Sequence, residues 1–204
     1  MRALWLVVLA AGVAGAQVPE RSTGALSRAA VARANAKNAV RFDATFQKYS
    51  KRYFGVGFDW RLFKAQAMAE SNLDTAAVSW VGARGLMQLM PSTYSRIQSV
   101  KPEFGNIDDP EWNIAAGIMH NRHLWKLWSA TVPEEDRPNF MFGSYNAGEG
   151  NIARASKAAE ARALEPTRWS SIEQVAPDVP RWRYRETLGY VRKIESNYSK
   201  LRAP

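Results

Sequence analysis

A single acidic side chain, Glu70, ends an apolar run in the segment QAMAESNLDTAAVSWVGARGLMQLMPSTY, residues 66–94. Asp59 is a plausible N-cap for a helix that places Phe63, Ala67 and Glu70 on one face. A carboxylate on an inward helix face loses hydration in its charged form, which raises its pKa and lets it hold a proton at neutral pH. Such a group can be a general acid toward a glycosidic oxygen. Periodicity leaves a second interpretation open, in which Glu70 ends the helix in solvent.

The other side chains offer little competing chemistry. His120 and His123, the only histidines, lie three residues apart on a predicted helix, but no carboxylate follows at a metal-motif spacing, so we expect no metal site. The chain has neither a G-x-S-x-G nucleophile elbow nor a glycine-rich phosphate loop, and we expect no cofactor. It also has no cysteine, which excludes disulfides, thiolate zinc sites, cysteine nucleophiles and a lipid-modified cysteine.

The elements that must position Glu70 read as helices. Asp109 followed by Pro110 is the strongest start signal, because it pairs a capping residue with proline at the first helical position. No window shows sustained period-two alternation, so we predict an all-α fold. The expected helices cover 40–54, Asp59 to Glu70, a segment from Ser92, 109–128, a segment toward Phe142, 152–164 and 186–201.

Length and charge bound the organisation of the chain. The 204 residues, 46% of them hydrophobic, suffice for one well-formed core. Residues 1–16 read as a signal peptide, because Arg2 precedes an apolar stretch that ends in a small-residue A-x-A cleavage site at Ala14 and Ala16. The apolar stretch is shorter than the roughly 20 residues that span a bilayer, which argues against a membrane anchor. Residues 17–38 read as a basic polar tether, and 39–204 as the catalytic domain. The formal charge of +9 favours polyanionic partners, and export makes nucleic acid the least expected of them.

Several ordered motifs resemble the catalytic domain of the family-1 lytic transglycosylases, the soluble lytic transglycosylase (SLT) type that cleaves peptidoglycan. The matching positions are Glu70-Ser71, Ser79, the stretch from Gly82 to Pro91, Tyr145 to Gly148, Glu186-Thr187 and Tyr190-Val191. Their common order makes coincidence improbable. The resemblance covers roughly residues 58 to 200, and the tether before residue 40 lies outside it.

The resemblance implies an all-α, lysozyme-like fold with a glycan-binding groove, and it makes Glu70 the sole catalytic residue. Glu70 would protonate the oxygen that links N-acetylmuramic acid to N-acetylglucosamine. As a carboxylate it would then take a proton from the muramoyl C6 hydroxyl, which closes on C1 as a 1,6-anhydro ring. The substrate's own N-acetyl group would stabilise the cationic centre, so that no second carboxylate is needed.

The resemblance also names groove residues. Ser79, Gln88, Tyr145 and Asn146 match positions that line the groove in the family. Gln88 and Asn146 would hydrogen-bond N-acetyl or hydroxyl groups, and the Tyr145 hydroxyl would orient Glu70 or the sugar. Met87 is a further candidate for substrate contact, because methionine presents adaptable apolar surface.

Three further expectations concern packing. Met90 could serve a sugar or the core, and we expect the core. Glu186 is expected to hold the Glu70 helix through hydrogen bonds rather than to act in catalysis. The tryptophans are expected mostly in the core, with one or two free to stack on sugars: Trp80, Trp112, Trp125, Trp128, Trp169 and Trp182.

Two alternatives remain. A goose-type lysozyme would share the fold and the acid but release a hydrolytic product, and it would need a second carboxylate, for which Asp74, Glu149 and Glu186 are the candidates. A non-catalytic wall-binding module would keep the lysozyme-like groove and use the basic charge to hold an anionic wall. We expect a monomeric periplasmic enzyme whose substrate is the glycan strand of peptidoglycan, and whose N-terminal segment could serve a cell-envelope or secretion-system partner.

Overall fold

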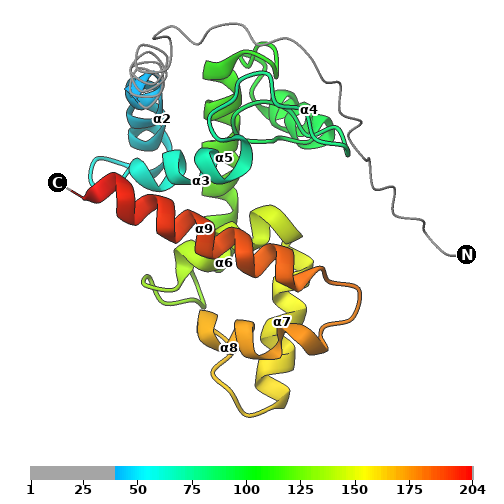
Figure 1. The fold of residues 1–204 in the computed structure, drawn as a ribbon. Helices are drawn as coiled ribbons and strands as arrows, with labels where there is room; N and C mark the ends of the chain where they lie inside the picture. The colour runs from blue at the N-terminus through cyan, green and yellow to red at the C-terminus, as the bar shows by residue number, and fades with distance from the viewer. Residues whose placement is uncertain (1–39, 204) are drawn as a thin grey trace, which may run out of the picture. The chain divides into compact units, whose positions relative to one another are not determined.

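This computed structural model describes residues 40–203. Helices α2 to α9 and the loops that join them form this part of the chain (Figure 1). Within that part the extended contacts are two isolated bridges, Val78 with Arg84 and Arg84 with Leu89. The all-α prediction is therefore confirmed. The predicted signal peptide and tether lie outside the described residues. The elements are α2 (Asp43–Phe54), α3 (Arg61–Ser71), α4 (Pro91–Val100), α5 (Pro110–Trp128), α6 (Arg137–Ala147), α7 (Glu149–Ala161), α8 (Trp169–Val175), the 3-10 helix η1 (Ala176–Asp178) and α9 (Tyr184–Arg202).

Helix α5 starts where the capping signal in the sequence predicts it. Asp109 accepts hydrogen bonds from the backbone N–H groups of Glu111 and Trp112 at 2.8 and 3.2 Å, and Pro110 opens α5. These bonds satisfy two of the otherwise unpaired N–H groups of the first turn. The predicted start of α5 is confirmed. At its other end, α3 stops directly after the Glu70-Ser71 pair, where Asn72 turns into the left-handed region with φ 54°.

Helix α8 is an element that the sequence analysis did not predict, since the expected helices pass from 152–164 directly to 186–201. Trp169, Ile172 and Val175 recur at intervals of three residues, and all three are buried. This spacing puts them on one face, which packs on α7. The flanking prolines hid a helix of only seven residues.

Helix α9 holds the helix that carries Glu70. It runs along α3 and also contacts α6, while α5 packs against both α2 and α6 (Figure 1). Two side chains of α9 reach backbone carbonyls of α3: Lys193 Nζ donates to the Ala69 oxygen at 2.8 Å, and Asn197 Nδ2 donates to the Ala65 oxygen at 3.2 Å. The end of α3 is therefore fixed by a helix more than a hundred residues later in the chain.

The tryptophans divide as expected between core and surface. Trp80 is 88% exposed, and Trp112 is half-buried. The remaining four named above lie in the core: Trp125, Trp128, Trp169 and Trp182. Only Trp80 of this set thus has its ring free for a partner.

Candidate active site

Glu70 lies in the last turn of α3 and is half-buried. The hydroxyl of Tyr190, from α9, donates to Glu70 Oε1 at 2.6 Å. Burial raises the pKa of Glu70 to about 7, although the Tyr190 hydrogen bond and the positive charge of Lys193 both pull it down. Of the two interpretations of Glu70, the structure supports the inward one. The side chain can therefore hold or release a proton near neutral pH.

A chain of buried amides stands behind that contact. Asn121 Nδ2, on α5, donates to Gln66 Oε1 at 2.6 Å, and Gln66 Nε2 donates to the Tyr190 hydroxyl oxygen at 3.0 Å. Because the Tyr190 oxygen accepts from Gln66, its one hydrogen is directed at Glu70. Gln66 and Asn121 are both fully buried. Three helices therefore fix the orientation of the Glu70 carboxyl group.

The sequence analysis did not predict this row of hydrogen bonds from Asn121 through Gln66 and Tyr190 to Glu70. Gln66 lies four residues before Glu70 and therefore on the same helix face. A polar amide on an otherwise apolar face was a signal that Glu70 has a buried polar neighbour. Tyr190 belongs to the matched motif Tyr190-Val191, but nothing in that motif indicated contact with Glu70. Asn121, in α5, carried no signal at all, because it lies far from α3 in the sequence.

Tyr145, near the end of α6, lies close to Glu70 without bonding to it. Its hydroxyl donates to the backbone oxygen of Met87 at 2.8 Å. Burial, and next the negative charge of Glu70, raise the pKa of Tyr145 well above its usual value. Tyr145 therefore stays neutral and anchors the loop beside the acid. The direct orienting bond to Glu70 comes from Tyr190 and not from Tyr145.

The loop between α3 and α4, residues 72–90, forms one wall beside Glu70. Ser71 Oγ donates to the Leu86 oxygen at 2.9 Å, and Asn113 Oδ1, from α5, accepts from the Met87 N–H at 2.8 Å. Gly85 has φ 72°, and a Cβ atom there would lie 2.5 Å from Asn113 Nδ2. Only glycine allows this close approach of the loop to α5.

Ser79 and Gln88 hold the turns of that loop. Ser79 Oγ accepts from the Ala83 N–H at 2.9 Å, which leaves its own hydrogen available. Gln88 Nε2 donates to the oxygens of Ala77 and Gly85 at 3.2 and 3.0 Å, so both of its N–H groups are used. What Gln88 offers a ligand is therefore the acceptor Oε1.

Met87 and Met90 differ from the sequence expectation in their exposure to solvent. Met87 is fully buried and packs against Gly117 of α5, so its side chain presents no surface to a sugar, and its prediction as a substrate contact is wrong. Met90 is 39% exposed, and its prediction as a core residue is wrong. The reason is backbone geometry: Gln88 has φ 45° in the left-handed region, and the turn there prevents any regular periodicity from Met87 to Met90.

Asn146 and Glu186 meet in a pocket of about 220 Å³ that also includes Arg181, Arg183 and Thr187. Glu186 is exposed and pairs with Arg183 at 2.9 Å. Its predicted role in holding the Glu70 helix is wrong, because other residues of α9 supply those bonds: Tyr190, Lys193 and Asn197.

The two histidines line a second pocket, of about 260 Å³, with Arg96 and Glu149. The His120 ring centre lies 5.2 Å from that of Tyr145, which places this pocket near the acid. Burial, and next the charges of His123 and Arg96, lower the pKa of His120 to about 4. Within residues 40–203, no group of three or more His, Asp or Glu side chains converges as metal ligands would.

The sequence profile of the Transglycosylase SLT domain matches residues 45–166, which is more than half of the chain. This chain belongs to the transglycosylase SLT domain family. It is 32% identical over 158 residues to the membrane-bound lytic murein transglycosylase F of Shewanella pealeana, covering 76% of this chain and 31% of that protein. The Marinobacter nauticus protein of the same name is 32% identical over 157 residues, with 76% and 30% covered. The chain thus spans about a third of the length of these curated relatives.

Solved structures confirm the lysozyme-like fold. The 70 kDa soluble lytic transglycosylase of Escherichia coli superposes with a TM-score of 0.59 and 26% identity, covering 78% of this chain and 23% of that one. An inactive mutant of the lytic transglycosylase Slt from Pseudomonas aeruginosa gives a TM-score of 0.62 with 24% identity, covering 81% and 25%. In the described residues of this SLT-family chain, no helix is both long and apolar enough to cross a membrane.

Proposed function

We propose that this protein is a peptidoglycan lytic transglycosylase that cleaves the bond between N-acetylmuramic acid and N-acetylglucosamine without water, with Glu70 as its only catalytic carboxyl group. The observation that carries the proposal is the setting of Glu70: a half-buried carboxyl group with a pKa raised to about 7, held by the Tyr190 hydroxyl. Family membership and the names of the relatives support the same activity.

In the first step the protonated Glu70 gives its hydrogen to the glycosidic oxygen. The bond from C1 of the muramoyl sugar to that oxygen breaks, and the N-acetylglucosamine side leaves as an alcohol. Glu70 is suited to this step because a pKa near the working pH lets it be protonated and still donate readily. The Tyr190 hydroxyl stabilises the carboxylate that this step produces.

In the second step the Glu70 carboxylate removes the proton of the muramoyl C6 hydroxyl. The C6 oxygen attacks C1, which forms the 1,6-anhydro ring and restores the protonated acid. Atoms and charge balance without water, since the proton lost in the first step returns in the second. Both steps use the same carboxyl group, that of Glu70. The bonds from Gln66 to Tyr190 and from Tyr190 to Glu70 fix its orientation for both steps.

The electrostatic surroundings of Glu70 support a single-carboxylate mechanism. A second carboxylate nearby would raise the pKa of Glu70 by like-charge repulsion. The groups that act on Glu70 are instead a tyrosine and a lysine. Of the three candidates for a second acid, Glu186 pairs with Arg183, Glu149 lines the histidine pocket, and Asp74 accepts from the Ala76 N–H. The substrate's own N-acetyl group would then stabilise the positive charge at C1.

Polar groups that are half-buried, in Ser79 and Gln88, or exposed, in Asn146, would hold the sugars. Gln88 supplies the acceptor Oε1, Ser79 a hydroxyl hydrogen and Asn146 an exposed amide. Met90, exposed at the end of the same loop, replaces Met87 as the apolar contact. The basic charge of the chain would favour an anionic wall, and the periplasm is the compartment in which this substrate is found.

Mass spectrometry of the muropeptides released from purified peptidoglycan tests the reaction. We expect 1,6-anhydro-muramoyl ends, which are one water lighter than hydrolysed ends. Reducing muramoyl ends would overturn the proposal in favour of a goose-type lysozyme and a second carboxylate. A folded protein that sediments with peptidoglycan and releases no product would be a wall-binding module.

Removal of the Tyr190 hydroxyl should change the pH dependence of activity. Glu70 must be protonated for the first step, so activity should fall as the pH rises through about 7. In Tyr190→Phe the carboxylate loses the hydroxyl that stabilises it, so the pKa of Glu70 should rise. The alkaline limb of the pH–rate profile should therefore move to higher pH, with maximal activity lowered roughly tenfold by the loss of orientation.

The matched control for Tyr190→Phe is Tyr198→Phe, which removes another hydroxyl of α9, one that donates to Asp59 at 3.0 Å. It should leave the alkaline limb where it is. An unmoved limb in Tyr190→Phe, measured from pH 5 to 9, would contradict the assignment of Tyr190 as the positioning residue.

A further inference from the structure

The segment between η1 and α9 is unusually rich in arginine. PRWRYRE, residues 180–186, places Arg181, Arg183 and Arg185 at alternate positions, and all three are exposed. Among the described residues their one ion pair is that of Arg183 with Glu186. The segment thus carries three positive charges and one negative charge.

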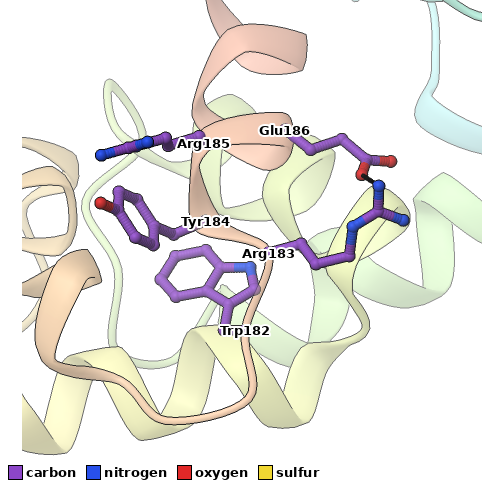
Figure 2. A pocket seen from close by; sticks show the side chains of 5 residues that line it. All are labelled: Trp182, Arg183, Tyr184, Arg185 and Glu186. Carbon is purple, nitrogen blue, oxygen red and sulfur yellow. Dashed lines mark ion pairs between the residues drawn. The ribbon is translucent and has the colours of Figure 1, made fainter. Parts of the chain in front are cut away.

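These arginines point to different sides of the segment. Figure 2 shows Arg183 and Glu186 extended to one side, while Arg185 lies beside the ring of Tyr184 on the other. The side with Arg183 and Glu186 lines the pocket that also includes Asn146 and Arg181. Within residues 40–203, neither Arg181 nor Asn146 has a hydrogen-bond or ion-pair partner for its side chain. We call this the arginine pocket: Asn146, Arg181, Arg183 and Glu186.

The backbone beneath the arginine pocket is held firmly. Trp182 is buried and donates from Nε1 to Thr187 Oγ1 at 3.0 Å. The Pro180 oxygen accepts from Arg154 Nη1 at 3.0 Å. Arg181, between them, has φ 60°, a left-handed conformation that is strained for a long side chain. Such strain persists only where the surrounding contacts enforce it, so the position of Arg181 is set in advance of any ligand.

The arginine pocket lies beside the proposed catalytic acid. Asn146 directly follows Tyr145, whose hydroxyl anchors the loop next to Glu70. On α9, Thr187 lines the pocket, and Tyr190, which holds Glu70, comes three residues later. Residues three apart on a helix lie on the same side, about one turn from each other. A glycan placed with its scissile bond at Glu70 therefore has its substituents within reach of these arginines.

We propose that the arginine pocket binds a carboxylate of the stem peptide attached to the muramoyl sugar, an inference that rests on the proposed function. The sugars of the strand are uncharged, whereas the stem peptide carries free carboxylates and hangs from the sugar whose C1 bond breaks. Guanidinium groups present a planar fork of N–H donors that matches a carboxylate. Arg181 has all its donors available, and Arg183 keeps donors beyond those that face Glu186. The pocket thus selects strands whose stem peptides carry free carboxylates.

The test compares two substrates: glycan strands with intact stem peptides, and the same strands with the carboxylates of the stem peptides converted to amides. The variant is Arg181→Asn/Arg183→Gln, because asparagine tolerates the left-handed backbone at position 181. We expect the wild type to cleave the strands with free peptide carboxylates with the higher kcat/KM. We expect the ratio of the two kcat/KM values to fall roughly tenfold in the variant, as loss of charge-assisted hydrogen bonds would give. The charge-matched control Lys51→Gln/Lys126→Gln should keep the wild-type ratio.

The outcomes separate this inference from the proposed function. Cleavage by the wild type with no preference between the strands, or a preference that survives in the variant, overturns the carboxylate site and leaves the transglycosylase intact. No cleavage of either strand by folded wild type overturns the proposed function instead. Arg183→Lys gives a second test, since lysine keeps the charge but not the fork, and its ratio should fall between wild type and Arg183→Gln. Inorganic phosphate is a further probe. If it inhibited cleavage of both substrates and left the ratio of the two kcat/KM values unchanged, the pocket would be assigned to a phosphate and not to the peptide.

Discussion

Glu70→Gln should lower the rate of peptidoglycan cleavage roughly a thousandfold, in line with the loss of general acid and base catalysis. Glutamine can still accept the Tyr190 hydrogen bond, so the orientation and the fold should survive. It cannot give a proton to the glycosidic oxygen or take one from the C6 hydroxyl. The measurement is the release of muropeptides under single-turnover conditions, together with sedimentation of the variant with peptidoglycan.

Binding and cleavage should therefore separate in this variant, with sedimentation close to that of the wild type. The control is Glu160→Gln, which removes an exposed carboxylate of α7 and should cleave like the wild type. A Glu70→Gln protein that retained more than a tenth of the wild-type rate would show that another group is the acid.

The same substitution should also change how stability depends on pH. The pKa of Glu70 is raised in the folded protein, so ionisation of Glu70 costs stability once the pH exceeds its ordinary value of 4.5, and the cost levels off above about 7. Glu70→Gln removes that cost. We expect the variant to gain about 1 to 2 kcal/mol of unfolding free energy over the wild type at pH 8, after discounting for the partial exposure of Glu70, and little at pH 4. Equal differences at both pH values in urea titrations would contradict the raised pKa.

Local spacing was enough to predict the start of α5. It also put Glu70 on the same helix face as Phe63 and Ala67, but it left open whether Glu70 itself turns inward or ends the helix in solvent. Each depends on residues within one or two turns: Phe63 and Ala67 share a face with Glu70, and Asp109 caps the helix that Pro110 opens. Such signals are written in consecutive residues. The resemblance to the SLT family supplied the fold and the groove residues that spacing could not.

What the sequence did not reveal depends on contacts between distant segments and on irregular backbone. The bond from Tyr190 to Glu70 joins residues on different helices, and no pattern in α3 specifies its partner. The exposure of Met90 and the burial of Met87 follow from the left-handed turn at Gln88, where neither helical nor strand periodicity holds. Glu186 looked like the natural partner of the Glu70 helix because of its place in a motif. It lies one turn too early on α9, and Tyr190 reaches the acid instead.

Asn113→Ala should be the most destabilising single substitution near the site, because this one buried side chain ties the loop of residues 72–90 to α5. Asn113 Oδ1 accepts from the Met87 N–H at 2.8 Å, and its Nδ2 donates to the oxygens of Arg84 and Ile107 at 3.0 and 2.9 Å. Alanine leaves the Met87 N–H and the Ile107 oxygen without partners, while the Arg84 oxygen keeps the Leu89 N–H at 3.1 Å. Each unsatisfied buried group costs about 1 to 3 kcal/mol, and with partial relaxation we expect a loss of about 3 kcal/mol in unfolding free energy. Thermal unfolding should show a midpoint lower by about 6 to 12 °C.

The loss in Asn113→Ala should reach the chemistry as well as the stability. The Met87 N–H donates to Asn113, and the Met87 carbonyl oxygen accepts from Tyr145. A loop released from α5 therefore also releases Tyr145, whose ring lies close to Glu70 in space. Asn113→Asp distinguishes the cause: it keeps an acceptor for Met87 but loses both donors, and its carboxylate would face two carbonyl oxygens. We therefore expect it to be at least as unstable as Asn113→Ala. Asn139→Ala, which removes one surface hydrogen bond to Glu195, is the control and should cost less than about 1 kcal/mol. If Asn113→Asp proved as stable as the wild type, the two donor bonds would not be what holds the loop, and the bond from the Met87 N–H, which this variant keeps, would be.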